Sequence, residues 1–332
     1  MRNSKIAGMG FYVPEKVVKN SDLQKFMDTN DEWIQERTGI KERRFYDKKK
    51  DTVANMGVKA AKIALERANI KADDLDFIIF ATLSPDYFFP GSGVLVQKEL
   101  GVKEIGALDV RNQCSGFIYA LSIADNFIKT GMYDNVLVIG SEIHSSGLDM
   151  STRGRNVSVI FGDGAGACVL KPEKDSNKGI LTTNLHSQGE FAEELAVIHP
   201  GSSGDERLTK EMIDDARIYP YMNGNFVFKH AVTRMPEAIM EALNKTGKKI
   251  EDVDLVIPHQ ANARITEFVA RTFKLPPEKV VSNIHKYGNT TAASIPIAMC
   301  EAWEEGRFKE GDLVCLTAFG SGFTWASALV QF

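Results

Sequence analysis

The chain has 332 residues, of which 43% are hydrophobic and 25% are charged, a balance typical of a globular protein of about two to three domains and not of a disordered chain. Its net charge of −4 argues against a nucleic-acid-binding protein, which needs a basic surface. No apolar run approaches the roughly 18 residues of a membrane span, and the first residues, M-R-N-S-K-I-A-G-M-G-F, lack the apolar segment of a secretory signal. We therefore expect a cytoplasmic protein that neither spans a membrane nor binds nucleic acid.

In chain order, helical and strand patterns alternate and then repeat. Residues 56–80 carry an amphipathic helix, an acidic turn and a β-branched strand, and residues 235–257 carry the same three features. Residues 114–140 and 289–316 form a second matching pair, each with a helical pattern, a glycine and a strand. Such alternation favours an α/β protein with a mixed, mostly parallel sheet and helices on its faces.

The repeat predicts two similar halves. Asp76 and Asp254 lie 178 residues apart, and Cys114 and Asn289 lie 175 apart, so the cysteine and the asparagine are expected at equivalent positions of the two halves. We expect an N-terminal half over 1–172, a C-terminal half over 173–332, and a crossover within 171–225. Each half is predicted to end in a pair of strands: N-V-L-V-I-G-S-E with V-S-V-I-F-G-D-G-A-G-A-C-V-L-K-P, and D-L-V-C-L-T-A-F-G with F-T-W-A-S-A-L-V-Q-F.

Cys114, His259 and Asn289 each follow an apolar run and precede a helical pattern. Turns of this kind in α/β proteins point side chains into a common crevice. Cys114 is expected near a helix N-terminus, where the dipole favours the thiolate, and a thiol beside an imidazole and an amide suggests an enzyme that holds an acyl group as a thioester. Each residue also has a structural interpretation, as a buried thiol, a hydrogen-bonded histidine or a helix N-cap. The place of Cys114 opposite Asn289 in the repeat favours the functional one.

The sequence offers two sets of neutral hydrogen-bond donors for a developing negative charge. His259 and Asn289 can donate hydrogen bonds to a developing oxyanion. The tight turn F-G-S-G-F at 319–323 can complete an oxyanion hole with the backbone N–H of Cys114. The remaining cysteines lie in strand or helical patterns and are predicted to be buried, with no disulfide framework or zinc site: Cys168, Cys300 and Cys315.

Three other segments are interpreted as structural. F-G-D-G-A-G at 161–166 and G-M-G at 8–10 lack the complete phosphate-binding motifs, so no nucleotide is predicted there. K-E-R-R at 41–44 and K-K-K at 48–50 form a basic run, predicted to be a solvated loop. The alternative is a landing site for an acidic carrier or for the phosphates of coenzyme A.

At these residues the sequence closely resembles the ketoacyl synthase III family, the condensing enzymes that start fatty-acid synthesis on the thiolase fold. The resemblance covers nearly the whole chain. It implies a thiolase-like α/β fold in which two βαβ-containing halves, with mixed five-stranded sheets, pack around a shared helix layer. The motifs that carry it are D-E-W-I-Q-E-R-T-G-I-K-E-R-R, C-S-G-F, R-G-R near 153, F-G-D-G-A-G-A, P-H-Q-A-N-A-R-I, Y-G-N-T-T-A-A-S and G-F-T-W-A-S-A-L-V.

The resemblance implies a decarboxylating condensation of an acyl-CoA with malonyl-acyl carrier protein, which initiates fatty-acid synthesis. Cys114 would take the acyl group, and His259 with Asn289 would stabilise the enolate formed as carbon dioxide leaves. The carbanion would then attack the acyl-Cys114 to give a β-ketoacyl product on the carrier protein. The backbone N–H groups of Cys114 and Ser321 would hold the thioester oxyanion. No metal or other cofactor is implied, because loss of carbon dioxide drives the reaction.

The resemblance also implies binding residues and a homodimer. Lys229 and Arg264 match positions linked to docking of the carrier protein, and Phe89 matches a residue that reaches the acyl pocket of the partner subunit. The residues matched to coenzyme A binding are Trp33, Arg37, Arg153, Gly224, Asn225 and Asn262.

Several departures leave the acyl substrate open. Ser321 stands where the family commonly has glycine, and R-G-R-N-V-S-V-I-F is two residues longer than the usual R-G-T-I-I-I-F. The alternative function is therefore a ketoacyl synthase III-like enzyme of secondary metabolism with a non-acetyl donor. A non-decarboxylating condensation would need a glutamate base, and Asp86 is the nearest acid in the 81–91 loop. A non-catalytic scaffold on the same fold would not need the intact Cys-His-Asn set.

Overall fold

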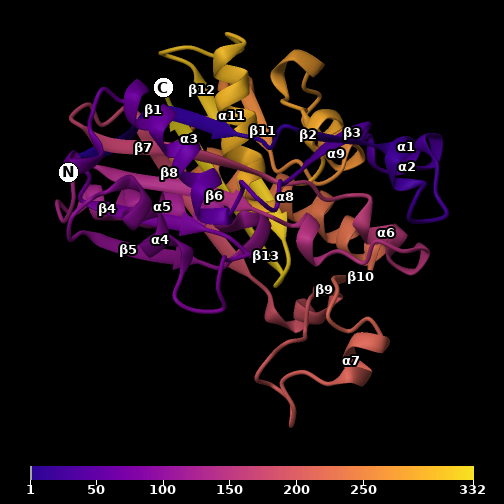
Figure 1. Cartoon of the computed structure of the whole chain (residues 1–332). Helices are drawn as coiled ribbons and strands as arrows, with labels where there is room; N and C mark the ends of the chain where they lie inside the picture. The colour runs from indigo at the N-terminus through magenta and orange to yellow at the C-terminus, as the bar shows by residue number, and fades with distance from the viewer. Residues whose placement is uncertain (1) are drawn as a thin grey trace.

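The computed structural model describes residues 2–332, in which two large β-sheets repeat one topology (Figure 1). In the N-terminal sheet, β7 runs antiparallel to both of its neighbours, whereas β6, β4 and β5 are parallel. All seven residues of β6 are buried, as expected for a strand covered by helices on both faces. The strand order is β1 (Asn3–Tyr12), β7 (Gly164–Glu173), β6 (Val136–Glu142), β4 (Phe77–Ala81) and β5 (Gly106–Val110).

The C-terminal sheet has the same order and directions but one strand fewer. Its strands are β8 (Gly179–Ser187), β13 (Thr324–Gln331), β12 (Leu313–Gly320) and β11 (Leu255–Pro258). β13 is antiparallel to both neighbours and β11 is parallel to β12. At the place that β5 takes in the first sheet, only an isolated bridge joins Val256 to Val280. The prediction of five strands is therefore correct for the first sheet and wrong for the second.

Helices α5 (Gly116–Lys129) and α11 (Ser294–Glu304) lie between the two sheets. Their apolar side chains, such as Phe117, Leu121 and Met299, belong to one buried cluster with strands of both sheets. Helices α3 (Val53–Arg67) and α4 (Ser92–Leu100) cover the outer face of the first sheet. Helices α8 (Gly224–Thr246) and α9 (Ala263–Thr272) cover the outer face of the second. This is the predicted packing of two halves around a shared helix layer.

Each half carries one excursion between its first strand and its first long helix. In the first half it consists of β2 (Lys16–Lys19), α1 (Asn20–Leu23), α2 (Asp31–Thr38) and β3 (Glu42–Phe45). In the second it consists of β9 (Leu195–Ala196), α7 (Lys210–Asp214) and β10 (Tyr221–Met222), and α7 extends away from the sheets at the bottom of Figure 1. Two short helices, α6 (Arg155–Ser158) and α10 (Ile284–Tyr287), precede β7 and the turn of Asn289.

The two central helices begin at matching turns. A 3₁₀ turn, Gln113–Ser115, precedes α5, and another, Thr291–Ala293, precedes α11. Gln113 and Thr291 both have positive φ, of 43° and 52°, and they lie 178 residues apart. The counterpart of Cys114 is therefore Ala292, and the predicted equivalence of Cys114 with Asn289 is wrong by three residues. The difference arises because α11 is 11 residues long and α5 is 14.

Two predicted segments differ in the structure. β8 begins at Gly179, so the crossover spans only residues 174–178 and the rest of 179–225 belongs to the second half. The first residues of V-S-V-I-F do not form a strand, because Arg155–Ser158 is helical and β7 starts at Gly164. The division at 172/173 falls in the last residues of β7 and stays a prediction.

The basic run at 41–44 is not a solvated loop. Arg43 lies in β3 and is fully buried. Its guanidinium donates to the backbone oxygen of Val159 at 2.7 Å and to Asn20 Oδ1 at 2.8 Å, and these acceptors replace the water that a buried cation loses. Arg43 therefore supports the core beside the site and is not a landing point for phosphates.

Candidate active site

One cavity of about 610 Å³ brings most of the predicted site residues together. It opens between α2, α8 and the ends of the central strands. Residues that sequence analysis did not single out also line it, among them Phe228, Leu195 and Met222. The predicted residues that line it are Trp33, Arg37, Cys114, Gly224, Asn225, His259, Asn262, Arg264 and Asn289.

Cys114 lies at the start of α5, inside this cavity. The backbone N–H groups of Cys114 and Ser321, the two donors predicted for the oxyanion hole, lie near its sulfur and act to lower the pKa of the thiol. Gly320 lets the strand β12 approach, since a Cβ there would lie 2.7 Å from the Cβ of Cys114. Burial raises the pKa of the Cys114 thiol to about 12, and the nearby Glu142 carboxyl adds to the rise. Burial outweighs the helix N-terminus, so the unliganded protein carries a thiol and not the expected thiolate.

His259 follows β11, and its imidazole is held by Ser294. His259 Nδ1 lies 2.6 Å from Ser294 Oγ, and the backbone N–H of Gln260 donates to the same oxygen at 3.4 Å. If Nδ1 also donated to it, the Ser294 hydroxyl hydrogen would be buried without an acceptor, which costs about 1–3 kcal/mol. We infer that Ser294 donates to Nδ1, which places the ring hydrogen on Nε2.

Nε2 of His259 is buried and has no protein partner among residues 2–332. Burial lowers the pKa of His259 to about 3. The imidazole is therefore neutral at physiological pH, and Nε2–H is a free donor directed at the cavity.

Asn289 is held in place by hydrogen bonds of its backbone and of its side-chain oxygen. Its N–H donates to Ile160 O at 2.9 Å, and its carbonyl accepts from Gly162 N at 3.0 Å. Its Oδ1 accepts from Thr291 N at 2.8 Å, an Asx turn. The alternative of a helix N-cap is wrong, since Ala293 is the N-cap residue of α11. With Oδ1 occupied, the Nδ2 hydrogens remain as the donors of Asn289 to the cavity.

Glu142 is a buried carboxyl that sequence analysis missed. It ends β6 and accepts hydrogen bonds from Ser84 Oγ at 2.6 Å, Thr82 Oγ1 at 3.0 Å and Ala292 N at 3.4 Å. These donors are neutral, and burial raises the pKa of Glu142 to about 7. Glu142 joins the end of β4 to the start of α11 and so forms the wall behind Cys114.

Arg155, and not Arg153, lies against Trp33, which lines the cavity, and Arg155 also pairs with Asp28. The guanidinium of Arg155 lies 5.3 Å from the ring centroid of Trp33, and that of Arg37 lies 4.4 Å from it. Arg153 instead pairs with Asp149 at 2.7 Å and donates to Asp214 O at 3.0 Å. The geometry therefore argues against Arg153 at this place. The sequence could have indicated Arg155. It stands six residues before Phe161, the same spacing as between the arginine and the phenylalanine of R-G-T-I-I-I-F.

The other predicted binding residues occupy different places. Asn262 caps α9, accepting from Arg264 N at 2.9 Å, and its Nδ2 donates to Arg37 O at 2.8 Å. Arg264 lies over the ring of Phe228. Lys229, the residue after Phe228 in α8, is exposed. Phe89 is 79% exposed and does not line the cavity of its own chain.

The acid of the 81–91 loop that sequence analysis considered as a base is committed elsewhere. Asp86 accepts hydrogen bonds from Val53 N at 2.9 Å and Ala54 N at 3.0 Å, and from Ser92 Oγ at 2.8 Å. It thus satisfies the first N–H groups of α3. This position argues against a non-decarboxylating condensation with Asp86 as the base.

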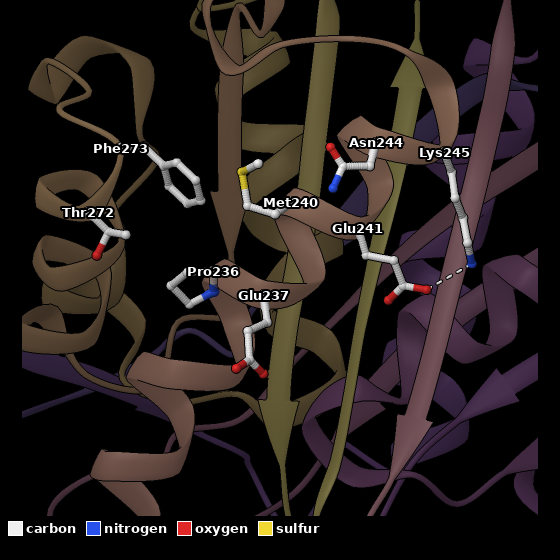
Figure 2. Close-up of a pocket in the computed structure, with 8 residues that line it drawn as sticks. All are labelled: Pro236, Glu237, Met240, Glu241, Asn244, Lys245, Thr272 and Phe273. Carbon is white, nitrogen blue, oxygen red and sulfur yellow. Dashed lines mark ion pairs between the residues drawn. The ribbon is translucent and has the colours of Figure 1, made fainter.

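A second pocket lies on the outer face, between α8 and the end of α9 (Figure 2). Met240, Pro236 and Phe273 line its apolar part. Its carboxylates are already paired: Glu237 with Arg234, and Glu241 with Lys245 and His186. Its lysine and its hydroxyl are also engaged, since Lys245 pairs with Glu241 and Thr272 donates to Phe268 O, so this pocket is a weaker candidate site than the first.

Residues 2–332 offer neither a metal site nor a membrane-spanning helix. They contain no group of three or more histidine, cysteine or acidic side chains placed to hold a metal ion. None of their helices is both long and apolar enough to cross a membrane.

A buried thiol with two backbone donors at its sulfur, beside a neutral imidazole and a neutral amide, defines a thiol-dependent acyltransferase that stabilises an oxyanion or enolate. The family model "3-Oxoacyl-[acyl-carrier-protein (ACP)] synthase III" matches residues 108–189, and the model of its C-terminal part matches 243–332. The chain is 47% identical over 329 residues to the beta-ketoacyl-[acyl-carrier-protein] synthase III of Aquifex aeolicus, covering 99% of both chains. The chain belongs to the 3-oxoacyl-[acyl-carrier-protein] synthase III family.

Solved structures agree with this placement. The crystal structure of the Aquifex aeolicus synthase III matches with a TM-score of 0.90 and 46% identity, over 99% of this chain and 100% of that one. The priming beta-ketosynthase from the R1128 polyketide biosynthetic pathway matches with a TM-score of 0.90 and 31% identity, over 99% and 96%. The predicted thiolase-like fold and the predicted enzyme class, a condensing acyltransferase of fatty-acid initiation, are confirmed.

Proposed function

We propose that this chain condenses an acyl-CoA with malonyl-acyl carrier protein, with loss of carbon dioxide, to give a β-ketoacyl-carrier product. One observation carries the residue roles: the free Nε2–H of His259 and the free Nδ2 hydrogens of Asn289 open into the same cavity as the thiol of Cys114. Two neutral donors suit an enolate oxygen, since a buried site strengthens hydrogen bonds to developing charge.

In the first half-reaction, the sulfur of Cys114 attacks the thioester carbonyl. The oxygen that becomes negative lies toward the backbone N–H groups of Cys114 and Ser321. The C–S bond to coenzyme A breaks, the thiol proton of Cys114 leaves with the coenzyme A sulfur, and an acyl-Cys114 remains.

In the second half-reaction, the malonyl thioester loses carbon dioxide. The electron pair of the broken C–C bond moves into the thioester carbonyl, and His259 with Asn289 donates hydrogen bonds to the resulting enolate. The enolate carbon attacks the acyl-Cys114 carbonyl, the C–S bond breaks, and the released Cys114 sulfur takes up a proton. No cofactor enters these steps, and activity is expected to survive dialysis against a chelator.

Intact-protein mass spectrometry tests this function. The protein is mixed with acetyl-, branched or longer acyl-CoAs and then with malonyl-carrier protein. We expect a mass gain of one acyl group on Cys114, discharged as carbon dioxide appears. The second candidate, a specialised condensing enzyme, is favoured by the uncommon Ser321 and by the likeness to the R1128 priming synthase. Labelling only by longer acyl groups would support it.

Trp33 and Arg155 are proposed to stack on the adenine of coenzyme A. Arg155→Ala is expected to raise the KM for acyl-CoA about tenfold, the effect of losing roughly 1.4 kcal/mol of cation–π and stacking contact. Steady-state kinetics with Arg153→Ala provides the matched control, because Arg153 is bound to Asp149 and Asp214. A larger rise for Arg153→Ala would restore the original assignment of Arg153.

Lys229 and Arg264 are proposed to contact the acidic carrier protein at the mouth of the cavity. Lys229→Glu is expected to raise the KM for malonyl-carrier protein about tenfold through like-charge repulsion, while acylation by acyl-CoA is unchanged. Kinetics with both substrates measures this. An equal rise for both substrates would assign Lys229 to coenzyme A binding instead.

The homodimer is proposed to form through β5. This strand is hydrogen-bonded on one side only, to β4, and unpaired edges are normally covered. Leu108 of β5 is 38% exposed, and Phe88 and Phe89 of the loop between β4 and α4 are 62% and 79% exposed. A second copy related by a two-fold axis would cover both features, and the mass in solution measured by light scattering decides between one chain and two. The cytoplasmic location stays a prediction, to be measured by cell fractionation.

A further inference from the structure

The turn that carries the Ser321 N–H is anchored by the Ser321 side chain. The Ser321 hydroxyl donates a hydrogen bond to the backbone carbonyl of Leu195. Ser321 follows β12, and its own N–H lies near the sulfur of Cys114. One residue therefore presents a donor to the nucleophile and a second donor to a distant segment of the chain.

Leu195 belongs to a small ribbon that forms part of the cavity wall. β9 pairs with β10, with Leu195 opposite Met222, and both residues line the cavity. The chain between the two strands reaches the body of the protein again where Arg153 donates to Asp214 O at 3.0 Å and where Arg207 lies 4.1 Å over Phe88. A molecule that fills the cavity thus presses on the ribbon to which Ser321 is tied.

The other side of the turn is tied to the helix of the nucleophile. Thr324 Oγ1 donates to Ser321 O at 3.1 Å and lies 2.7 Å from Ser115 Oγ. Ser115 follows Cys114, and its single hydroxyl hydrogen, donated to Thr324 Oγ1 and not to Asn112 O at 3.0 Å, completes a chain of two hydrogen bonds to Ser321 O. The peptide groups of the turn are therefore held on one side by the start of α5 and on the other by the ribbon. Only the contact with the ribbon depends on the Ser321 hydroxyl.

We propose that Ser321 is a positioning residue whose side chain couples the β9–β10 ribbon to the oxyanion hole. When acyl-CoA is bound against the ribbon, the hydrogen bond from the Ser321 hydroxyl to Leu195 O fixes the Ser321 N–H beside the reacting sulfur and carbonyl oxygen. Acyl-CoA binding and oxyanion stabilisation are thereby linked. This inference rests on the proposed function, since it assigns a role in acylation of Cys114. A glycine at this position has no such link, so the device belongs to this chain and not to the usual F-G-G-G-F turn.

Three variants and two reactions test the proposal. Ser321→Ala removes the hydroxyl and keeps the backbone N–H, and Ser321→Thr restores a hydroxyl. Ser327→Ala is the matched control. Ser327 lies in β13, and its Oγ also donates to a backbone carbonyl, that of Ala238 in α8, at 2.7 Å. The first reaction is alkylation of Cys114 by iodoacetamide between pH 7 and 10, and the second is single-turnover acylation by saturating acetyl-CoA.

The expected result separates a positioning role from a merely structural one. Ser321→Ala should slow acylation about fivefold to tenfold, below the roughly hundredfold cost of losing an oxyanion donor outright. The KM for acyl-CoA should change less than about twofold, because uniform binding is retained. Alkylation at each pH should also fall about threefold, since a displaced N–H stabilises the thiolate less. Ser321→Thr should recover most of both rates, and Ser327→Ala should match the wild type.

Two results would overturn the proposal. The first is a Ser321→Ala variant that is acylated and alkylated like the wild type. The second is a loss shared by Ser321→Ala and Ser327→Ala in proportion to their melting temperatures. Failure of the proposed function is distinct from both, because the wild-type protein would then be alkylated at Cys114 but acylated by no acyl-CoA.

Discussion

Cys114→Ala is expected to abolish acylation and to lower β-ketoacyl product formation by at least about 10⁴-fold, the scale of loss when an enzyme loses its nucleophile. Mass spectrometry after mixing with acyl-CoA should show no covalent adduct. The physical reason is that the chain has no substitute thiol at the cavity. Cys168, Cys300 and Cys315 are buried in the cores, and burial raises the pKa of each thiol.

The matched control is Cys315→Ala. Cys315 is as deeply buried as Cys114 but lies in the middle of β12, so its loss should affect stability and leave acylation intact. An adduct of one acyl group on Cys114→Ala, with product still formed, would place the nucleophile elsewhere. Loss of acylation in Cys315→Ala with an unchanged melting temperature would show that the assay does not isolate Cys114.

The three central residues could be predicted because their signals are local. His259 directly follows β11, and Cys114 and Asn289 lie in or beside the turns that precede α5 and α11, where a sequence pattern reports position well. The repeat also indicated two similar sheets. Its register was misjudged at Asn289 because α11 is shorter than α5, and a difference in helix length does not show in an apolar pattern. The missing fifth strand is a separate error: the segment around Val280 forms only a single bridge, to Val256.

Contacts between distant segments escaped prediction for a different reason. Ser294 reaches His259 from 35 residues away, and the Ser321 hydroxyl reaches Leu195 from 126 residues away. A hydroxyl has no sequence pattern that tells whether it faces water or a partner. The prediction for Arg43 was wrong for the opposite reason. A run of charged residues normally indicates a solvent-exposed segment, but the backbone carbonyls of Val18 in β2 and of Val159 accept hydrogen bonds from Arg43.

Among residues 2–332, the two groups proposed to contact the enolate, His259 and Asn289, are uncharged. Burial holds His259 neutral and Cys114 protonated, because it lowers the pKa of the first to about 3 and raises that of the second to about 12. A buried cation would attract the malonyl carboxylate and oppose its loss as carbon dioxide. Neutral donors act mainly on charge that develops on the thioester oxygen. The geometry therefore favours decarboxylation by oxyanion stabilisation alone.

His259→Ala and Asn289→Ala are expected to retain acylation and to lose malonyl decarboxylation, each by about 10²–10³-fold, the typical cost of removing one preorganised donor. Acylation should persist because the donors for that step are the N–H groups of Cys114 and Ser321. The acyl adduct is followed by mass spectrometry, and carbon dioxide release is measured with malonyl-carrier protein on preacylated enzyme. The double variant should lose less than the product of the two single losses, because both groups serve one oxygen.

His285→Ala is the control for the histidine, since His285 lies in α10 outside the cavity. It should keep both half-reactions. The decisive comparison is between the two steps within one variant. If His259→Ala failed to become acylated yet condensed normally from a preacylated state, His259 would be the base for Cys114 and not an enolate donor. Nε2 would then have to accept a proton, and the ring hydrogen would sit on Nδ1 with Ser294 Oγ as its acceptor. The step that is lost in His259→Ala therefore also reports which tautomer Ser294 sets. Measuring acylation and condensation in this one variant answers both questions.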